Sequence, residues 1–250
     1  MTTIIIGAGI AGLSAGYHLK QAGRDAIILE ARDRIGGRVW TNRDFADIPV
    51  EFGAELIHGS TVNTWEWVHK LSLKTLHWQK QGESMVRMED GRWLSMKEAR
   101  ATEPDFDVTR SWALGDVPEP EDNESLKDYL VRIGFSDEQL QYVRRSFANA
   151  EGDMEFLSAK AHANLFEDRD TDVENGYGDF RILDGYDSYY KKVAEGLDIR
   201  LNTVVTEIDW SDGVTVKTRS GETFTGDNAV ITLTVGILQA NTVKFMPELP

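Results

Sequence analysis

The sequence contains no cysteine, which excludes disulfide bridges, thiol catalysis and cysteine metal sites. A chain without cysteine suits either redox environment, so this absence leaves the compartment open. Basic residues are also few: 27 Lys and Arg stand against 42 Asp and Glu, and the formal net charge is -15. This charge argues against nucleic acid as a partner, because phosphates need basic side chains. It favours solubility and could attract a cationic substrate.

Long hydrophobic runs are absent too. Every apolar stretch is far shorter than the roughly 18 residues that a membrane-spanning helix needs, and residues 1–3 carry no basic region of a signal peptide. We therefore expect a soluble, cytoplasmic protein without membrane contact. The hydrophobic content of 41% suffices for one large domain or two modest ones.

The first thirty residues have the pattern of a β-α-β unit. Residues 2–6 are β-branched and uncharged, as in a buried strand, and residues 26–29 predict a second one. Between them, residues 10–22 predict a helix that ends at Gly23.

A GxGxxG turn joins the first strand to this helix, and that context favours dinucleotide binding. Gly7 allows the tight turn, Gly9 lets the backbone approach a pyrophosphate, and Gly12 lets the helix pack closely on the strand. The first helical turn, with Ile10 and Ala11, offers unpaired N–H groups to phosphates.

The second strand ends at Glu30, eighteen residues after Gly12. A carboxylate at this place can accept hydrogen bonds from ribose hydroxyls, and it repels a 2′-phosphate. NADP is therefore disfavoured. FAD and NAD both fit the turn and the acid equally well.

The following stretch separates these two cofactors. Residues 30–39 read EARDRIGGRV and closely resemble the segment after the ribose-binding acid in the flavin-containing amine oxidases. The resemblance implies FAD, with Gly36 and Gly37 letting the backbone pass close to the dinucleotide and Arg38 offsetting pyrophosphate charge. It also implies cofactor contacts at the two residues after the acid, Ala31 and Arg32.

Other parts of the chain resemble the same family. Residues 51–59 are similar to the segment beside the flavin ring, which implies cofactor contacts at Gly53, Ala54 and Glu55. Residues 199–208 resemble the strand whose backbone near Val205 receives the adenine. Residues 229–238, which include Thr232, resemble the strand and turn that re-enter the flavin domain, and 245–250 resemble the turn that follows. Residues 183–195 resemble a glycine turn and helix of the family.

The resemblance implies a doubly wound α/β fold with an inserted substrate domain. The FAD-binding domain is expected at residues 1–75 and 184–250, and an α+β substrate-binding domain at 76–183. Family members are considerably longer than this chain. The part beyond residue 250 would carry a lysine near flavin N5, a glycine-rich segment over FAD and much of the aromatic substrate cage. We therefore expect a fragment, a shortened chain or one half of an enzyme completed by a second chain, with a homodimer as a further possibility.

Individual elements are predicted along the rest of the chain. Helices are expected at 61–71 and 137–149, with capping boxes at Ser125 and Ser136. Asp90-Gly91 predicts the turn of a hairpin over 85–94, and acidic, proline-containing residues 102–124 predict a surface loop. Strands are expected at 199–209, 213–218 and 223–231.

Two residues are candidates for substrate binding. His58 lies in an Ile-His-Gly stretch that resembles polyamine oxidases, in which this histidine faces the substrate channel. Glu151 resembles a channel glutamate that receives a remote ammonium group, and Glu155 is a nearby competitor. The sequence has no basic residue between Arg43 and His58, which disfavours an L-amino-acid oxidase.

The resemblance implies an FAD-dependent oxidation of a primary or secondary, polyamine-like amine to an imine. Hydride passes to flavin N5 and O2 is reduced to H2O2; the cofactor supplies the chemistry, so no protein nucleophile and no metal is expected. Two alternatives stay open. The chain could be a non-catalytic FAD- or NAD-binding subunit or scaffold, or belong to a flavin desaturase of the same fold.

Overall fold

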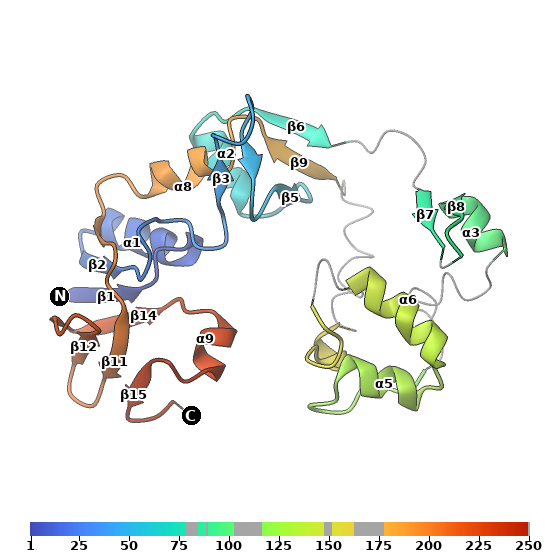
Figure 1. The fold of residues 1–250 in the computed structure, drawn as a ribbon. Helices are drawn as coiled ribbons and strands as arrows, with labels where there is room; N and C mark the ends of the chain where they lie inside the picture. Colours follow the sequence, from blue (N-terminus) through green and yellow to red (C-terminus); the bar gives the residue numbers. More distant parts are fainter. Residues whose placement is uncertain (79–84, 89, 103–116, 148–151, 163–177, 250) are drawn as a thin grey trace. The chain divides into compact units, whose positions relative to one another are not determined.

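The computed structural model describes residues 1–78, 85–88, 90–102, 117–147, 152–162 and 178–249. The chain divides into two compact units (Figure 1). The first is formed by Met1–Trp78 together with Asp179–Pro250, and the second by Gln79–Gly178. That one part binds FAD and the other substrate stays a prediction. Within the described ranges, no helix combines the length and apolar composition needed to cross a membrane.

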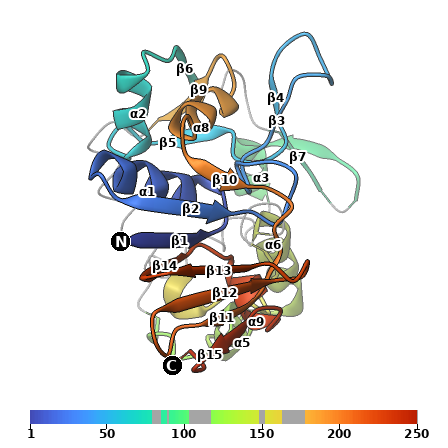
Figure 2. The ribbon, with the colours of Figure 1, turned by 90° about the vertical axis from the view of Figure 1, so that its left-hand side faces the viewer.

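A four-stranded parallel sheet with the order β10-β2-β1-β14 lies in the first unit (Figure 2). Its strands are β1 (Thr2–Ile6), β2 (Asp25–Leu29), β10 (Asp198–Arg200) and β14 (Asn228–Ile231). Helix α1 (Ile10–Gln21) connects β1 to β2, so the predicted β-α-β start is confirmed. Ile6 is in register with both Leu29 and Ile231, which places three carboxyl ends level with the glycine turn.

A second sheet of four strands, ordered β13-β12-β11-β15, follows in the same unit (Figure 2). Strands β11, β12 and β13 are antiparallel, and β15 runs parallel to β11. Their bounds are β11 (Val205–Asp209), β12 (Val214–Thr218), β13 (Thr223–Gly226) and β15 (Lys244–Met246).

Two strand predictions were wrong in one respect, because the stretches 199–209 and 223–231 each divide between the two sheets. In the first stretch the chain leaves the parallel sheet through Asn202, whose φ of 54° is outside the range of a strand. In the second it turns at Asp227, whose backbone N–H donates to the Thr2 carbonyl at 2.8 Å. The Asp227 carboxylate also accepts from the Thr2 N–H at 2.6 Å. The sequence pattern does not show such crossings, since the residues on each side of the crossing form strands.

The parallel sheet is covered on both faces. Ile5 of β1 is fully buried among side chains of α1 and α8 (Asp187–Val193), whereas its neighbours Ile4 and Ile6 are buried against the antiparallel sheet. Successive strand residues point to opposite faces, so a strand buried on both sides must be apolar throughout. This explains the uninterrupted isoleucine run at the start of the sequence.

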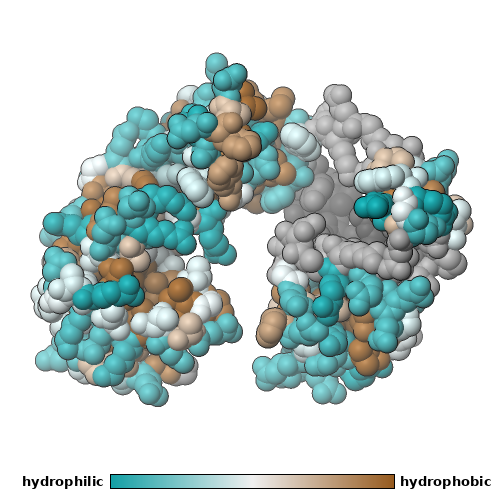
Figure 3. Space-filling model, in the orientation of Figure 1, coloured by the Kyte–Doolittle hydropathy of each residue, from teal (hydrophilic) through white to brown (hydrophobic). Residues whose placement is uncertain are grey.

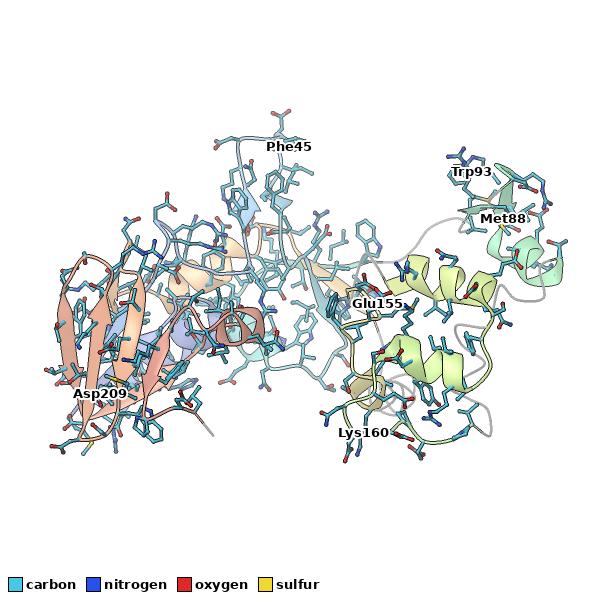
Figure 4. All side chains as sticks on the ribbon, turned by 60° about the horizontal axis from the view of Figure 1, so that its bottom comes forward. Phe45, Met88, Trp93, Glu155, Lys160 and Asp209 are labelled. Carbon is cyan, nitrogen blue, oxygen red and sulfur yellow. The ribbon has the colours of Figure 1, made fainter. Side chains whose placement is uncertain are left out.

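A smaller antiparallel sheet completes the first unit, with the order β5-β9-β6. Its strands are β5 (Leu56–His58), β6 (Thr75–Trp78) and β9 (Asp179–Ile182), and helix α2 (Thr64–Lys70) lies between β5 and β6 in the sequence. A short hairpin of β3 (Thr41–Asn42) and β4 (Val50–Glu51) precedes it. Phe45 in the hairpin loop is 73% exposed and points away from the sheets (Figure 4).

The second unit contains a hairpin and a helical cluster. Strands β7 (Met85–Arg87) and β8 (Trp93–Ser95) confirm the predicted hairpin, and helix α3 (Met96–Thr102), which the sequence did not predict, follows it. Helices α5 (Leu126–Arg132) and α6 (Asp137–Phe147) begin at the two expected caps. Their apolar faces share a core with Met154 and Ala159. Most of the expected surface loop, residues 103–116, lies outside the described residues.

Candidate cofactor site

The glycine turn and the start of α1 form the first part of the site. Gly7 has a φ of 104°, a conformation that L side chains rarely adopt. A Cβ on Gly12 would lie 1.9 Å from the Gly7 carbonyl oxygen, so helix and turn are in direct backbone contact. Gly9 is the extended N-cap and supplies no side-chain hydrogen bond. The first amides of the helix, at Ile10 and Ala11, therefore have no capping side chain and suit an anion.

Glu30 lies beside this turn, immediately after β2. Its side chain is buried, and one carboxylate oxygen accepts from the Ala8 N–H at 2.7 Å. The other oxygen accepts from the Arg32 N–H at 2.9 Å. Each carboxylate oxygen has a second lone pair, so both can still accept from a ribose hydroxyl. The acid that the sequence singled out is thus fixed at the edge of the turn.

The double-glycine segment packs directly on the first turn. The Gly36 N–H donates to the Ala8 carbonyl at 2.8 Å, and a Cβ on Gly37 would lie 3.1 Å from the Gly9 Cα. Both Gly36 and Gly37 have positive φ, 99° and 61°. The two glycine motifs, separated in sequence by the whole of α1 and β2, therefore pack backbone against backbone, with Gly9 and Gly37 partly exposed and Gly36 buried against Tyr190.

Three arginines near this surface have different environments. Arg34 donates to the carbonyls of Gly37 at 3.0 Å and Ile35 at 3.2 Å, and its guanidinium lies 5.1 Å from the Trp40 ring centroid. It holds the double-glycine turn, a role that the sequence analysis missed. Arg38 is exposed, and among the described residues no hydrogen bond or ion pair of its side chain is seen. Arg32 and Ala31 are exposed before the turn.

A third segment, Gly53 to Glu55, lies against the second. The Ala54 N–H donates to the Arg38 carbonyl at 3.2 Å, and a Cβ on Gly53 would lie only 2.0 Å from that oxygen. Glu55 forms an ion pair with Arg181 of β9 at 2.7 Å. Three of the segments predicted to touch the cofactor are thus stacked in the order 7–12, 36–38 and 53–55.

The two remaining predicted positions come from the end of the chain. Thr232 lies behind the glycine turn, where its hydroxyl donates to the Ile6 carbonyl at 2.7 Å. Val205 is buried at the start of β11. The preceding Thr203 N–H donates to the Glu30 carbonyl at 2.8 Å, so the chain leading to Val205 runs beside the ribose-binding acid.

A bare apolar surface adjoins these segments. Trp40 and Phe52 flank the β3–β4 hairpin, with ring centroids 5.1 Å apart, and both are more than 40% exposed. Phe45 and Ile48 in the hairpin loop are more exposed still. Figure 3 shows apolar side chains gathered over this hairpin. No local signal in the sequence marked these four residues as exposed.

The two predicted substrate residues have different outcomes. His58 ends β5 with its side chain 69% exposed, and its Nδ1 lies 2.7 Å from an oxygen of Asp179 on β9. Glu151 lies outside the described residues. Its competitor Glu155 lies beside α5 and α6 (Figure 4) and pairs with Lys127 and Arg144, both at 2.9 Å. With two cations already bound, Glu155 is poorly suited to receive an ammonium group.

The Glu155 pairs lead to a prediction for the second unit. The hydrogen bond from Lys127 is the largest of several effects that lower the pKa of Glu155 from 4.5 to about 2. A lowered pKa stabilises the fold above pH 4.5, and this stabilisation is lost as the pH falls toward 2. We expect Glu155→Gln to lower Tm by about one or two degrees at neutral pH, since the pairs are partly solvated. The gap to the unsubstituted protein should close in acid. Thermal melts of both proteins and of a Glu119→Gln control, between pH 2 and 7, test this; a gap that persists at pH 2 contradicts it.

Comparison with known proteins identifies the family. The family model "Flavin containing amine oxidoreductase" matches residues 10–250. The chain belongs to this family. Membership of this family indicates FAD as the cofactor, so the choice of FAD over NAD is confirmed. The α/β fold class is confirmed as well.

Individual relatives support the same assignment. Over 274 residues the chain is 31% identical to "Polyamine oxidase 4" of Oryza sativa subsp. japonica, covering all of this chain and 54% of that protein. It is 31% identical to "Lysine-specific histone demethylase 2" of Homo sapiens over 99% of this chain and 32% of the relative. A solved structure of putrescine oxidase bound to putrescine has the same fold, with a TM-score of 0.74 at 22% identity, over all of this chain and 62% of that one. The chain thus spans about half the length of the polyamine oxidases.

Proposed function

We propose that this amine oxidoreductase chain is the FAD-binding part of an enzyme that oxidises a primary or secondary amine to an imine. One observation carries the proposal: three glycine-containing segments, distant in sequence, stack backbone against backbone into one surface beside the buried Glu30. FAD held beside Gly9 and Glu30 would supply the redox chemistry, namely acceptance of a hydride from the carbon next to the amine nitrogen and transfer of the two electrons to O2, which leaves as H2O2.

The proposed contacts follow from the geometry of this surface. The N–H groups at the start of α1, near Gly9, Ile10 and Ala11, suit the pyrophosphate. Glu30 suits the ribose hydroxyls, and the exposed Arg38 guanidinium suits a phosphate charge. The remaining predicted contacts line the same surface or run beside it: Gly7, Gly12, Ala31, Arg32, Gly36, Gly37, Gly53, Ala54, Glu55, Val205 and Thr232. The chain's own part in the chemistry is to bind, orient and exclude water.

A polyamine-like substrate is the proposed substrate class. Relatives named polyamine oxidase and a structural neighbour named putrescine oxidase support it, as does the net charge of -15, which attracts cations. His58 is the proposed substrate-facing residue of the first unit, because its exposed ring can accept a hydrogen bond from an amine nitrogen. Glu151 stays a prediction. A cytoplasmic location also stays a prediction.

A further polypeptide segment is proposed to complete the enzyme, either in the same chain or as a second chain; a homodimer is the alternative. The support is that the polyamine oxidases extend well beyond the matched region. Strand β14 forms one edge of the parallel sheet, and Val235 and Ile237 of helix α9 (Val235–Gln239) are exposed beside it. Edges of this kind are normally paired or covered.

The decisive experiment combines a visible absorption spectrum with mass analysis of the purified protein, followed by a peroxide assay. We expect flavin absorbance, and peroxide release with putrescine, spermidine or spermine when the completing segment is present. The rate should rise with pH, since the substrate ammonium, with a pKa of about 10, must lose a proton before hydride can leave. Absence of flavin from the completed protein would refute the proposal. Flavin without peroxide for any amine would favour the non-catalytic subunit.

A further inference from the structure

His58 and Asp179 form a side-chain pair that has no role in the proposed cofactor site. They lie opposite each other where β5 and β9 pair antiparallel, and residues at such positions have neighbouring side chains on the same face. Their Nδ1 to Oδ1 distance is 2.7 Å. Asp179 is the first residue of β9, 121 positions from His58, so only the fold brings them together.

The backbone around the pair is held on both sides. Ile57, which precedes His58, is 1% exposed and anchors β5 in the core. Trp65 donates from its ring N–H to the Gly59 carbonyl at 2.9 Å, directly after His58. The same tryptophan packs edge-on against Phe180, directly after Asp179, with ring centroids 4.9 Å apart. The geometry of the pair therefore rests on one buried neighbour, Ile57, and two partly buried ones, Trp65 and Phe180.

The Asp179 carboxylate determines which ring nitrogen of His58 carries a proton. An ionised carboxylate can only accept hydrogen bonds, so the Nδ1 that faces Asp179 must carry a proton. In a neutral ring the other nitrogen, Nε2, is then an acceptor. An acceptor at this exposed nitrogen can bind an N–H of an amine or ammonium group, whereas the Nε2–H tautomer would place an N–H donor there.

We propose that Asp179 is a positioning residue, which holds the His58 ring in the Nδ1–H tautomer and so leaves Nε2 ready to accept from the substrate amine. The proposal rests on the proposed function in one part only, the identity of the group that meets Nε2. The tautomer itself can be measured without substrate, flavin or turnover.

The first experiment measures the tautomer. In uniformly 15N-labelled protein, long-range 1H–15N correlations distinguish Nδ1–H from Nε2–H rings, and the spectrum of Asn-substituted His58 (His58→Asn) identifies the signals of this residue. We expect the Nδ1–H form in the unsubstituted protein and a shift toward Nε2–H in Asp179→Ala. Asp198→Ala is the matched control, because that exposed carboxylate pairs with Arg200 and not with a histidine. An Nε2–H ring in the unsubstituted protein, or an unchanged ring in Asp179→Ala, overturns the proposal.

A second variant guards against local unfolding of β9. Asp179→Val removes the acceptor but keeps a residue that strands favour. It should change the tautomer as Asp179→Ala does, with unchanged melting. If Asp179→Val melts normally and retains the Nδ1–H form, the carboxylate does not position the ring.

The second experiment is a double-mutant cycle in the complete, flavin-loaded enzyme, with putrescine as substrate. We expect Asp179→Ala to raise KM about fivefold with kcat nearly unchanged, the size expected for one lost hydrogen bond. In a His58→Ala background it should have no further effect, since Asp179 acts through His58. An equal rise of KM in both backgrounds would mean that Asp179 meets the amine directly and would overturn the positioning role. If the complete enzyme oxidises no amine, the proposed function fails, and the tautomer measurement still decides the role of Asp179.

Discussion

Substitution of Gly12 by alanine should weaken FAD binding severely, whereas the same substitution one turn further along α1, at Gly16, should not. The added Cβ at Gly12 would lie 1.9 Å from the Gly7 carbonyl oxygen and 3.1 Å from its carbon, both of them backbone atoms of the glycine turn. This clash can be relieved only if α1 moves away from the sheet or the glycine turn changes its conformation. The N–H groups proposed to meet the pyrophosphate move in either case.

Gly16→Ala is a matched control because it is also a glycine-to-alanine substitution in α1. A Cβ there would lie 2.8 Å from the Ile28 Cδ1, the end of a side chain that can rotate, and alanine favours a helix by about 1 kcal/mol over glycine. We expect FAD affinity to fall at least about a hundredfold in Gly12→Ala, with a loss of about 2 kcal/mol in stability from overpacking. Gly16→Ala should stay near the unsubstituted values.

Titration of the apoprotein with FAD, followed by the quenching of flavin fluorescence, measures the first quantity, and thermal melting measures the second. Equal FAD affinity in both variants would show that the close contact of helix and turn does not shape the cofactor surface. A loss of binding in Gly16→Ala as well would assign the effect to α1 as a whole.

Asp187→Ala should destabilise the first unit by about 2 kcal/mol, the second large effect. The Asp187 side chain is 2% exposed and accepts hydrogen bonds from Arg43 and Lys191. Its backbone N–H donates to the Thr41 hydroxyl at 3.0 Å, and that hydroxyl donates to Glu51 at 2.7 Å. The group ties α8 to the β3–β4 hairpin. Breaking a buried pair costs about 3–5 kcal/mol, and we expect less here because both cations are about half exposed.

The loss should depend on pH. Burial raises the pKa of Asp187, but the hydrogen bonds from Arg43 and Lys191 outweigh this and leave it below the ordinary value of 3.8. A group whose pKa is lowered by folding stabilises the fold above its ordinary pKa and loses that effect in acid. The gap in unfolding free energy between Asp187→Ala and the unsubstituted protein should therefore be full above about pH 4 and narrow below it.

Denaturant unfolding at pH 7 and pH 3 checks this expectation. Asp198→Ala again serves as a control, since that carboxylate is exposed and pairs only with its neighbour Arg200 among the described residues. A gap of the same size at both pH values would show that the charge of Asp187 does not carry the effect. FAD affinity should also fall in Asp187→Ala, because the hairpin connects the second and third glycine segments.

The turns proposed to bind the cofactor were predictable because each requires glycine at particular positions. Gly7 and Gly36 adopt positive φ, and Gly12 and Gly53 meet backbone atoms at distances that exclude any Cβ. Such requirements leave glycines at fixed spacings, and the spacing can be recognised in one sequence. The same holds for the apolar first strand, which is buried on both faces.

Other features left no local trace. Arg34 and Arg38 are the same residue type four positions apart, yet one binds the carbonyls of the double-glycine turn and the other is exposed. Nothing in the composition of 199–209 or 223–231 shows where the chain passes from one sheet to the next. The pairing of Glu155 with Lys127 and Arg144 depends on how α5 and α6 pack.

The β-α-β start, the family resemblance and the choice of cofactor thus follow from the sequence alone, because they rest on contiguous motifs with strict steric demands. Which side chains meet depends on tertiary packing. That packing brings the three glycine segments together and places Asp179 beside His58, 121 positions away. Contacts between residues so far apart come from strand pairing and shared cores. Many different local sequences can form such contacts, so no particular pattern is required around either residue.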